Sequence, residues 1–239
     1  MNQPLESTVE STVASTAPIL PLRIVQTFTS PGELFARLRE TPVWIDAMVA
    51  LIALGVLFQF VQPESLQVAA IEAFAPEGVD PEELVRSPSL VSTTLGALIF
   101  TPAFTALIAG MLLLNYNVVM GGEGTFRQLF SAATHAQFVN MAGAYVILGL
   151  AFLGSDQLVL SPALLLPDLG AGFLGRFVGS INVFAVWTCV VLGIAVHRIY
   201  PKRSVAGAAV YLLVLYLVLV GLGAAFAGAL MGLAASGAG

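Results

Sequence analysis

The side chains of this chain that could do chemistry are a few polar groups set among long apolar runs. They are Asp46, Asn115, Asn117, Thr134, His135, Gln137 and Asn140. Exposing such groups to lipid is costly, so we expect them to face one another or a water-filled cavity. If Asp46 approaches His135, protonation of the imidazole could matter near neutral pH. Two interpretations stay open: hydrogen bonds between helices, or a polar vestibule that opens toward the cytosol.

No residues have the spacing of a known catalytic or metal site. The stretch from Gly121 to Gly124 lacks the Lys-Ser/Thr ending of a phosphate-binding loop, and a tight turn explains it better because glycine tolerates positive φ. The two histidines, His135 and His197, are far apart in sequence, and together with Cys189 they do not make a metal site by spacing. We therefore predict no catalytic residues, no metal and no cofactor.

Composition indicates that the solvent of this chain is a lipid bilayer. Of its 239 residues 58% are hydrophobic and 10% are charged, and the mean hydropathy is +0.93. Soluble domains carry about 25% charged residues, so this chain cannot cover itself with a solvated surface. The excess of acidic over basic residues (14 against 9) argues against nucleic acid as a partner. The single cysteine excludes an internal disulfide.

Five apolar segments are long enough to cross a bilayer, which takes about 20 residues for a helix. We expect an all-α polytopic membrane protein, a bundle of five transmembrane helices, with Pro102 bending the second. The predicted spans are residues 43–61, 91–119, 129–153, 177–196 and 205–230.

The chain before the first span divides into two parts. Residues 1–27 are polar, short-sided and without helical periodicity, which predicts a disordered cytosolic tail ahead of a membrane domain over residues 28–239. Residues 30–40 are expected to form a short helix with Leu34, Phe35 and Leu38 on one face, Ser30 as its cap and Glu33 in the capping box. We interpret this helix as interfacial, lying in the headgroup layer. A solvated helix continuing into the first span is the alternative.

The basic residues predict the orientation. With five spans, seven of the nine basic residues lie on one side of the membrane, and two (Arg86 and Arg176) lie on the other side. Basic residues favour the cytosolic side, so the amino terminus is expected in the cytosol and the carboxyl terminus outside. The seven are Arg23, Arg37, Arg39, Arg127, Arg198, Lys202 and Arg203.

Small and polar residues of the last two spans point to close helix packing. Gly228 and Gly232 have the Gly-x-x-x-Gly spacing that lets helices approach closely, and Asn182 and Trp187 belong to the stretch 180–187 near the start of the fourth span. Packing within one chain and oligomerisation through the same face are both open.

Three stretches resemble the Yip-domain (Ypt-interacting protein) membrane family in its prokaryotic branch. The first is Pro-Gly-Glu-Leu-Phe from Pro31, followed by Pro-Val-Trp from Pro42. The second runs from Gly121 to Leu129 and contains Gly121, Gly122, Gly124, Arg127 and Gln128. The third is Ile-Asn-Val-Phe from Ile181, followed by Trp187.

The resemblance implies a five-helix membrane domain with a cytosolic amino terminus. Eukaryotic relatives act in vesicle traffic and bind prenylated small GTPases. The Asp-Leu-Tyr-Gly-Pro stretch typical of those members is missing here, so GTPase binding is not carried over. The resemblance transfers no catalytic residues.

Two functions remain from the sequence. The first is a non-enzymatic scaffold or membrane-organising protein of the prokaryotic plasma (inner) membrane, which works through its cytosolic face and through helix packing. Its expected partners are the bilayer and either further copies of the chain or other membrane proteins. The second is a transporter or channel subunit that uses the polar vestibule.

Overall fold

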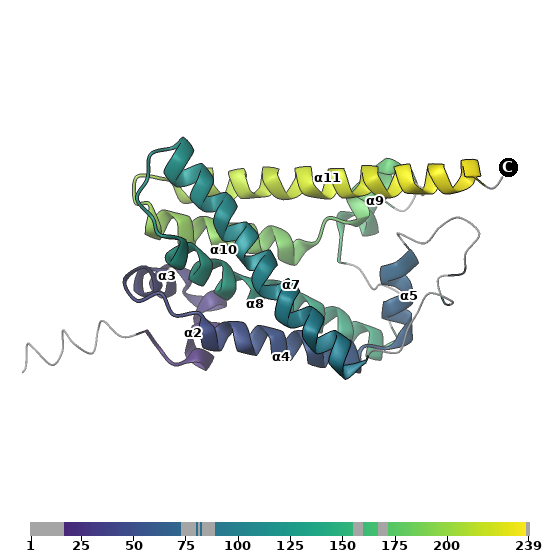
Figure 1. The fold of residues 1–239 in the computed structure, drawn as a ribbon, viewed down its shortest axis with the longest axis horizontal. Coiled ribbons are helices and arrows are strands. Elements are labelled where there is room, and N and C mark those ends of the chain that lie inside the picture. The colour runs from purple at the N-terminus through teal and green to yellow at the C-terminus, as the bar shows by residue number, and fades with distance from the viewer. Residues whose placement is uncertain are drawn as a thin grey trace, which may run out of the picture.

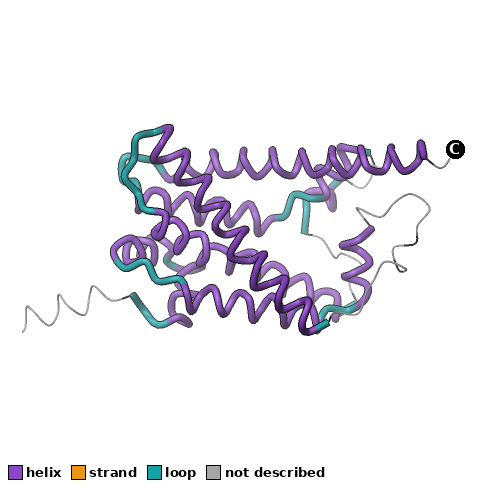
Figure 2. Tube along the Cα trace, in the orientation of Figure 1, coloured by secondary structure: helices purple, strands orange, loops and turns teal. Residues whose placement is uncertain are grey.

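The computed structural model describes residues 17–72, 80, 82, 89–154, 160–166 and 172–237, and its regular elements there are all helical (Figures 1 and 2). The all-α prediction is confirmed. The longer helices are α4 (Ile45–Val61), α7 (Leu90–Leu113), α8 (Phe126–Phe152), α10 (Val183–Ile199) and α11 (Val205–Gly237). The shorter ones are α2 (Leu20–Thr29), α3 (Pro31–Glu40), α5 (Glu64–Glu72), the 3-10 helix η2 (Pro162–Leu165) and α9 (Phe173–Gly179).

The longer helices run back and forth between two ends of a bundle, and the carboxyl end lies opposite α2 and α3 (Figure 1). Three helical segments are long and apolar enough to cross a membrane: Leu90–Val119, Phe126–Phe152 and Val205–Phe226. A fourth counts if α9 and α10, bent by 58° at their break, form one span. Helix α4 is apolar but has 17 residues, about 25 Å at 1.5 Å per residue. The described helices thus supply three to four spans, and the fifth stays a prediction.

Helix α2 lies where the sequence predicted the end of a disordered tail. Leu20, Ile24 and Phe28 recur every four residues and pack against a buried cluster on α4 and α8. This packed face stabilises the helix, so the prediction of disorder is wrong for residues 20–27. Residues 1–16 of that tail lie outside the described residues.

Helix α3 buries the apolar face that was expected to meet lipid headgroups. Leu34, Phe35 and Leu38 are at most 1% exposed and belong to the main core, in which α3 packs on α10. The three side chains therefore contact protein instead of lipid. The Ser30 side chain makes no capping hydrogen bond; its carbonyl accepts from the N–H group of Glu33.

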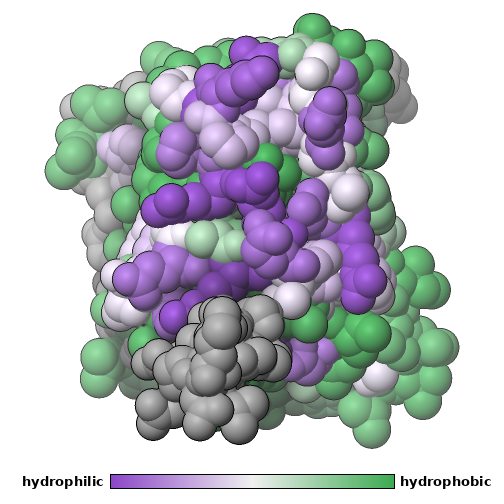
Figure 3. Space-filling view, turned by 90° about the vertical axis from the view of Figure 1, so that its left-hand side faces the viewer, coloured by the Kyte–Doolittle hydropathy of each residue, from purple (hydrophilic) through white to green (hydrophobic). Residues whose placement is uncertain are grey.

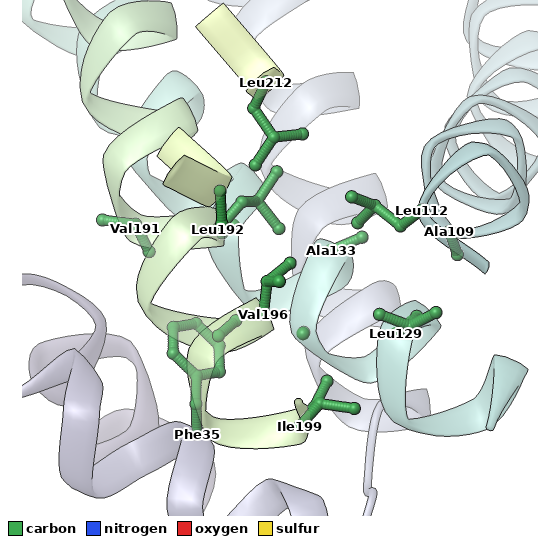
Figure 4. Packing of buried hydrophobic residues seen from close by; sticks show 14 of the residues in the cluster. Phe35, Ala109, Leu112, Leu129, Ala133, Val191, Leu192, Val196, Ile199 and Leu212 are labelled. Carbon is green, nitrogen blue, oxygen red and sulfur yellow. The ribbon is translucent and has the colours of Figure 1, made fainter. Parts of the chain in front are cut away.

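Helix α8 lies at the centre of the bundle, in contact with α2, α3, α4, α7 and α10. Figure 4 shows Leu129 and Ala133 of α8 in one core with Leu112 of α7 and Val196 of α10. The burial of α8 explains its sequence, because a helix surrounded by other helices can carry polar side chains wherever they find partners.

Two glycines allow close helix contacts around this core. A Cβ at Gly143 of α8 would lie 2.5 Å from the Phe184 ring, and one at Gly193 of α10 would lie 2.8 Å from the backbone nitrogen of Ala209. Small residues at such crossings let backbones approach, which is how helices in a bilayer gain packing contacts. Helix α10 is thereby held between α8 and α11.

Candidate functional site

One end of the bundle is polar. It carries α2, α3 and the connections over residues 120–125 and 200–204, and we call it the polar end. Figure 3 shows this end face-on, with hydrophilic residues at its centre and apolar surface beside them. Exposed basic side chains on it are Arg37, Arg39, Arg127, Arg198 and Lys202, and exposed acidic ones are Glu33, Glu40 and Glu123.

A partly buried ionic network lies at the polar end. The guanidinium of Arg23 on α2 donates to the carboxylate of Asp46, in the first turn of α4. Its other terminal nitrogen lies 3.2 Å from Nε2 of His135 on α8. Asp46 also accepts from the N–H group of Ala47 (2.9 Å), where the α4 dipole stabilises negative charge. The network joins three helices and neutralises the buried guanidinium.

The network determines the tautomer of His135. Arginine has donors and no acceptor, so Nε2 of His135 must accept and carries no proton. The proton sits on Nδ1, which donates to the Ser131 carbonyl at 2.8 Å. His135 is fully buried, and both its ring nitrogens have partners within the protein. It therefore acts as a neutral link between helices.

A second set of hydrogen bonds holds the connection over residues 120–125 in place. We call this set, made by Asn117, Tyr200 and Arg203, the lock around Tyr200. Helix α7 continues as the π-helix η1 (Leu114–Val119), whose Asn117 donates to the Gly124 carbonyl (2.6 Å) and accepts from the Tyr200 hydroxyl (2.7 Å). Burial raises the pKa of Tyr200 to about 12, so this hydroxyl keeps its proton at neutral pH. Arg203 adds a bond to the Met120 carbonyl at 2.7 Å.

The glycines of this connection fit the same lock. Gly121 has φ +67, a conformation that glycine adopts without steric cost. A Cβ at Gly122 would lie 2.7 Å from the Tyr200 ring, and one at Gly124 would lie 2.3 Å from its hydroxyl oxygen. One glycine therefore makes the turn, and two make room for Tyr200.

The start of α8 is tied to the segment between α3 and α4. Arg127 donates to the Pro42 carbonyl (3.2 Å) and Gln128 to the Arg39 carbonyl (2.8 Å). Gln128 also completes a capping box with Thr125. The Arg127 and Gln128 side chains of the predicted loop motif thus join chain segments more than 80 residues apart.

The predicted polar cluster does not gather in one place. Asp46 and His135 meet through Arg23, whereas Asn117 belongs to the lock around Tyr200. Gln137 and Asn140 bond to each other (3.0 Å) and line a separate cavity.

The other two members of the cluster stay apart from these groups. Thr134 donates to the Phe130 carbonyl of its own helix (2.8 Å). Nδ2 of Asn115 is buried and has no hydrogen-bond partner among the residues that the structure describes.

The predicted packing residues have local roles. Asn182 caps α10 by accepting from the Phe184 N–H group (2.8 Å), and the Trp187 ring packs edge-on against Phe28 at 5.5 Å. A Cβ at Gly228 would lie 2.6 Å from a guanidinium nitrogen of Arg176, so this glycine makes room for α9 within the same chain. The surroundings of Gly232 lie outside the described residues.

Arg23 and Tyr200 are the polar-end residues that sequence reasoning missed. Arg23 looked like a flanking charge, yet it is 3% exposed. The four-residue spacing of Leu20, Ile24 and Phe28 is the signal that could have revealed its helix. The close approach of Gly122 and Gly124 to the Tyr200 ring has no local sequence signature.

Comparison with protein families decides what kind of domain this is. The family model described as the Yip1 domain matches residues 25–228, from within α2 into α11. The chain belongs to the Yip1 domain family. The match contains the group around Asn117 and Tyr200 and most of α11. It begins two residues after Arg23, so of the ionic network it includes only Asp46 and His135. No curated protein and no solved structure matches the chain.

Proposed function

We propose that this Yip1 domain is a non-enzymatic scaffold that organises membrane proteins and presents its polar end to the cytosol of a prokaryotic cell. Its chemistry supports binding rather than turnover. At the polar end, Arg23 is paired with Asp46, and His135 bonds to the Ser131 carbonyl. Among the described residues, no group of three or more His, Cys, Asp or Glu side chains could hold a metal ion. A surface held in this way keeps its shape when a partner binds.

The observation that carries the proposal is the rigid assembly of the polar end from segments far apart in sequence. Side chains of Arg127, Gln128 and Ser131 bond to the backbone of residues 39–43, and Arg203 bonds to Met120. Meanwhile the terminal charges of Arg37 and Lys202 remain exposed. Such an arrangement offers fixed positive charges to an acidic partner surface.

The test is capture of partners by the intact protein in mild detergent. Replacing Arg37, Arg39 and Lys202 by Glu should abolish co-purification of membrane proteins seen with the unchanged chain, while the thermal unfolding midpoint stays the same. Glu64→Lys on α5, an exposed charge reversal at the other end of the bundle, is the matched control. Equal capture by the triple variant and the control would count against the proposal.

A transporter or channel subunit is the second candidate. The pairing of Asp46 with His135 through Arg23 is the feature that favours it, because such relays occur in pumps and transporters. The burial of Ser131, Thr134 and His135, each 0% exposed and hydrogen-bonded, favours the scaffold. Ion flux in proteoliposomes that disappears with His135→Ala would support the transporter.

A further inference from the structure

We infer that a cavity inside the bundle binds a neutral membrane lipid that carries a carbonyl or hydroxyl group. This inference concerns a site away from the polar end and does not depend on the scaffold role. The cavity has a volume of about 520 Å³, within the ~300–1,000 Å³ range of small-molecule sites. Its walls come mainly from α7, α8, α10 and α11.

Most of the cavity wall is hydrocarbon, which calls for an apolar occupant. Ile108, Met111, Ile147, Leu192 and Leu215 are among the lining residues. A void of this size would deprive its walls of packing contacts, and water finds few partners on an apolar wall. A flexible hydrocarbon chain supplies those contacts.

The cavity also contains amide groups whose bonding capacity is incompletely used. Asn140 donates to Oε1 of Gln137, and Oδ1 of Asn182 accepts from the Phe184 N–H group. Within the described part of the chain, Nε2 of Gln137, Oδ1 of Asn140 and Nδ2 of Asn182 have no hydrogen bond to protein. These atoms offer two donors and one acceptor to an occupant, a set that suits a carbonyl or a hydroxyl group.

The surrounding bilayer can supply the occupant sideways. Helices α7 and α11 both border the cavity, and in Figure 1 they diverge from the polar end toward the other end. Three lining residues on their flanks are also exposed at the surface: Phe104 (43%), Leu107 (58%) and Leu219 (53%). Since α7 and α11 are candidate spans, this side faces lipid when they cross the membrane. A lipid therefore reaches the cavity without entering water.

The depth of the amides selects a neutral lipid. Gln137 lies 11 residues after the start of α8 at Phe126, about 17 Å along the helix axis. This is roughly half of a ~30 Å hydrocarbon core. Burying a charged headgroup there is costly, whereas a carbonyl or a hydroxyl needs only the hydrogen bonds that the amides offer.

Photo-crosslinking tests this site. The full chain is placed in phosphatidylcholine liposomes with a diacylglycerol that bears a diazirine in one acyl chain, and the labelled peptides are mapped by mass spectrometry. We expect labelling of the cavity wall, and roughly thirtyfold less in the double variant Gln137→Leu/Asn140→Leu, because two hydrogen bonds of about 1 kcal/mol each are lost and every ~1.4 kcal/mol is a factor of ten. Phosphatidic acid with the same diazirine chain should label the cavity wall far less.

A steric variant with a matched control separates this site from the bilayer-facing surface. Ala185 lines the cavity, so Ala185→Phe should abolish labelling there, whereas Ala103→Phe on the exposed surface of α7 should leave it unchanged. If Ala185→Phe does not fold, the double variant Gln137→Leu/Asn140→Leu still tests the site, because leucine is similar in size to the side chains that it replaces. Unchanged labelling in the double variant, equal labelling by phosphatidic acid, or labels confined to residues outside the cavity would each overturn the inference.

Discussion

At the scale of single residues, Arg23 decides how the buried polar groups behave. Its guanidinium is 3% exposed while the Asp46 side chain is 50% exposed, so the pair neutralises a deeply buried cation with a carboxylate that water can still reach. A buried ion pair adds little stability compared with an apolar replacement, yet leaving one partner uncompensated is costly. The buried Arg23 therefore needs the Asp46 carboxylate as its counterion, although the pair itself adds little to the free energy of unfolding.

This asymmetry predicts the outcome for Asp46→Asn. The substitution leaves the buried Arg23 charge without a counterion, and we expect a loss toward the lower end of the ~3–5 kcal/mol typical of broken buried pairs, since water reaches the site. In an Arg23→Met background the same substitution should cost less than about 1 kcal/mol, because the charge is gone. Thermal unfolding of the four proteins in detergent measures the cycle. Equal losses in both backgrounds would show that the two residues are not coupled.

Gly124 makes a second prediction at this scale. A methyl group there collides with the Tyr200 hydroxyl, so Gly124→Ala should destabilise the protein by about 1–3 kcal/mol, as overpacking does. Gly96→Ala is the control, because a Cβ at Gly96 meets nothing within 4 Å. Unfolding midpoints of the two variants provide the comparison, and a Gly124→Ala protein as stable as the control would contradict the lock around Tyr200.

At the scale of elements, the amphipathic helices show that a local sequence pattern predicts an apolar face but does not predict what covers it. The sequence correctly marks an apolar face on residues 30–40, because the 3.6-residue period is a local property. Whether that face meets lipid or protein depends on α10, which comes some 150 residues later. The same holds for α2, which lies where the sequence predicted the end of a disordered tail and which packs Leu20, Ile24 and Phe28 against α4 and α8.

The burial of α3 predicts a large effect for Phe35→Ala. Removing a fully buried aromatic ring typically costs ~3–5 kcal/mol, whereas Arg37→Ala on the exposed face should stay within about 0.5 kcal/mol. Detergent-solubilised protein unfolded by heat gives both values. If α3 instead lay on the membrane with this face in lipid, Phe35→Ala would weaken membrane contact and leave the unfolding midpoint nearly unchanged.

At the scale of the whole molecule, the exposed basic side chains of the described residues and the connections after α7 and α10 lie at the same end of the bundle, the polar end. Among the described residues, these side chains are Arg37, Arg39, Arg127, Arg198 and Lys202. The chain returns to this end after α7 and after α10 (Figure 1). Arg23, which entered the charge count, is paired with Asp46, so six of the seven residues act as flanking charges. Six against two still favours the cytosol for this end.

Labelling of engineered cysteines tests the orientation. The native Cys189 is buried, so a membrane-impermeant maleimide should report only on added thiols. In intact cells we expect Glu64→Cys on α5 to be labelled and Glu123→Cys at the polar end to be protected, with the pattern reversed in inside-out vesicles. Labelling of Glu123→Cys in intact cells would invert the predicted topology.

The sequence by itself determined the class of protein, the approximate extent of its long helices, and the glycine-rich turn before α8. These features follow from composition, from hydrophobic runs and from local backbone preferences, all of which act over a few neighbouring residues. Only the tertiary structure decided that Arg23 meets His135, that Asn117 bonds to Tyr200 and that Gln137 and Asn140 line a cavity of their own. The physical reason is that a polar side chain in a membrane must find a partner, and the partner is chosen by how the helices pack.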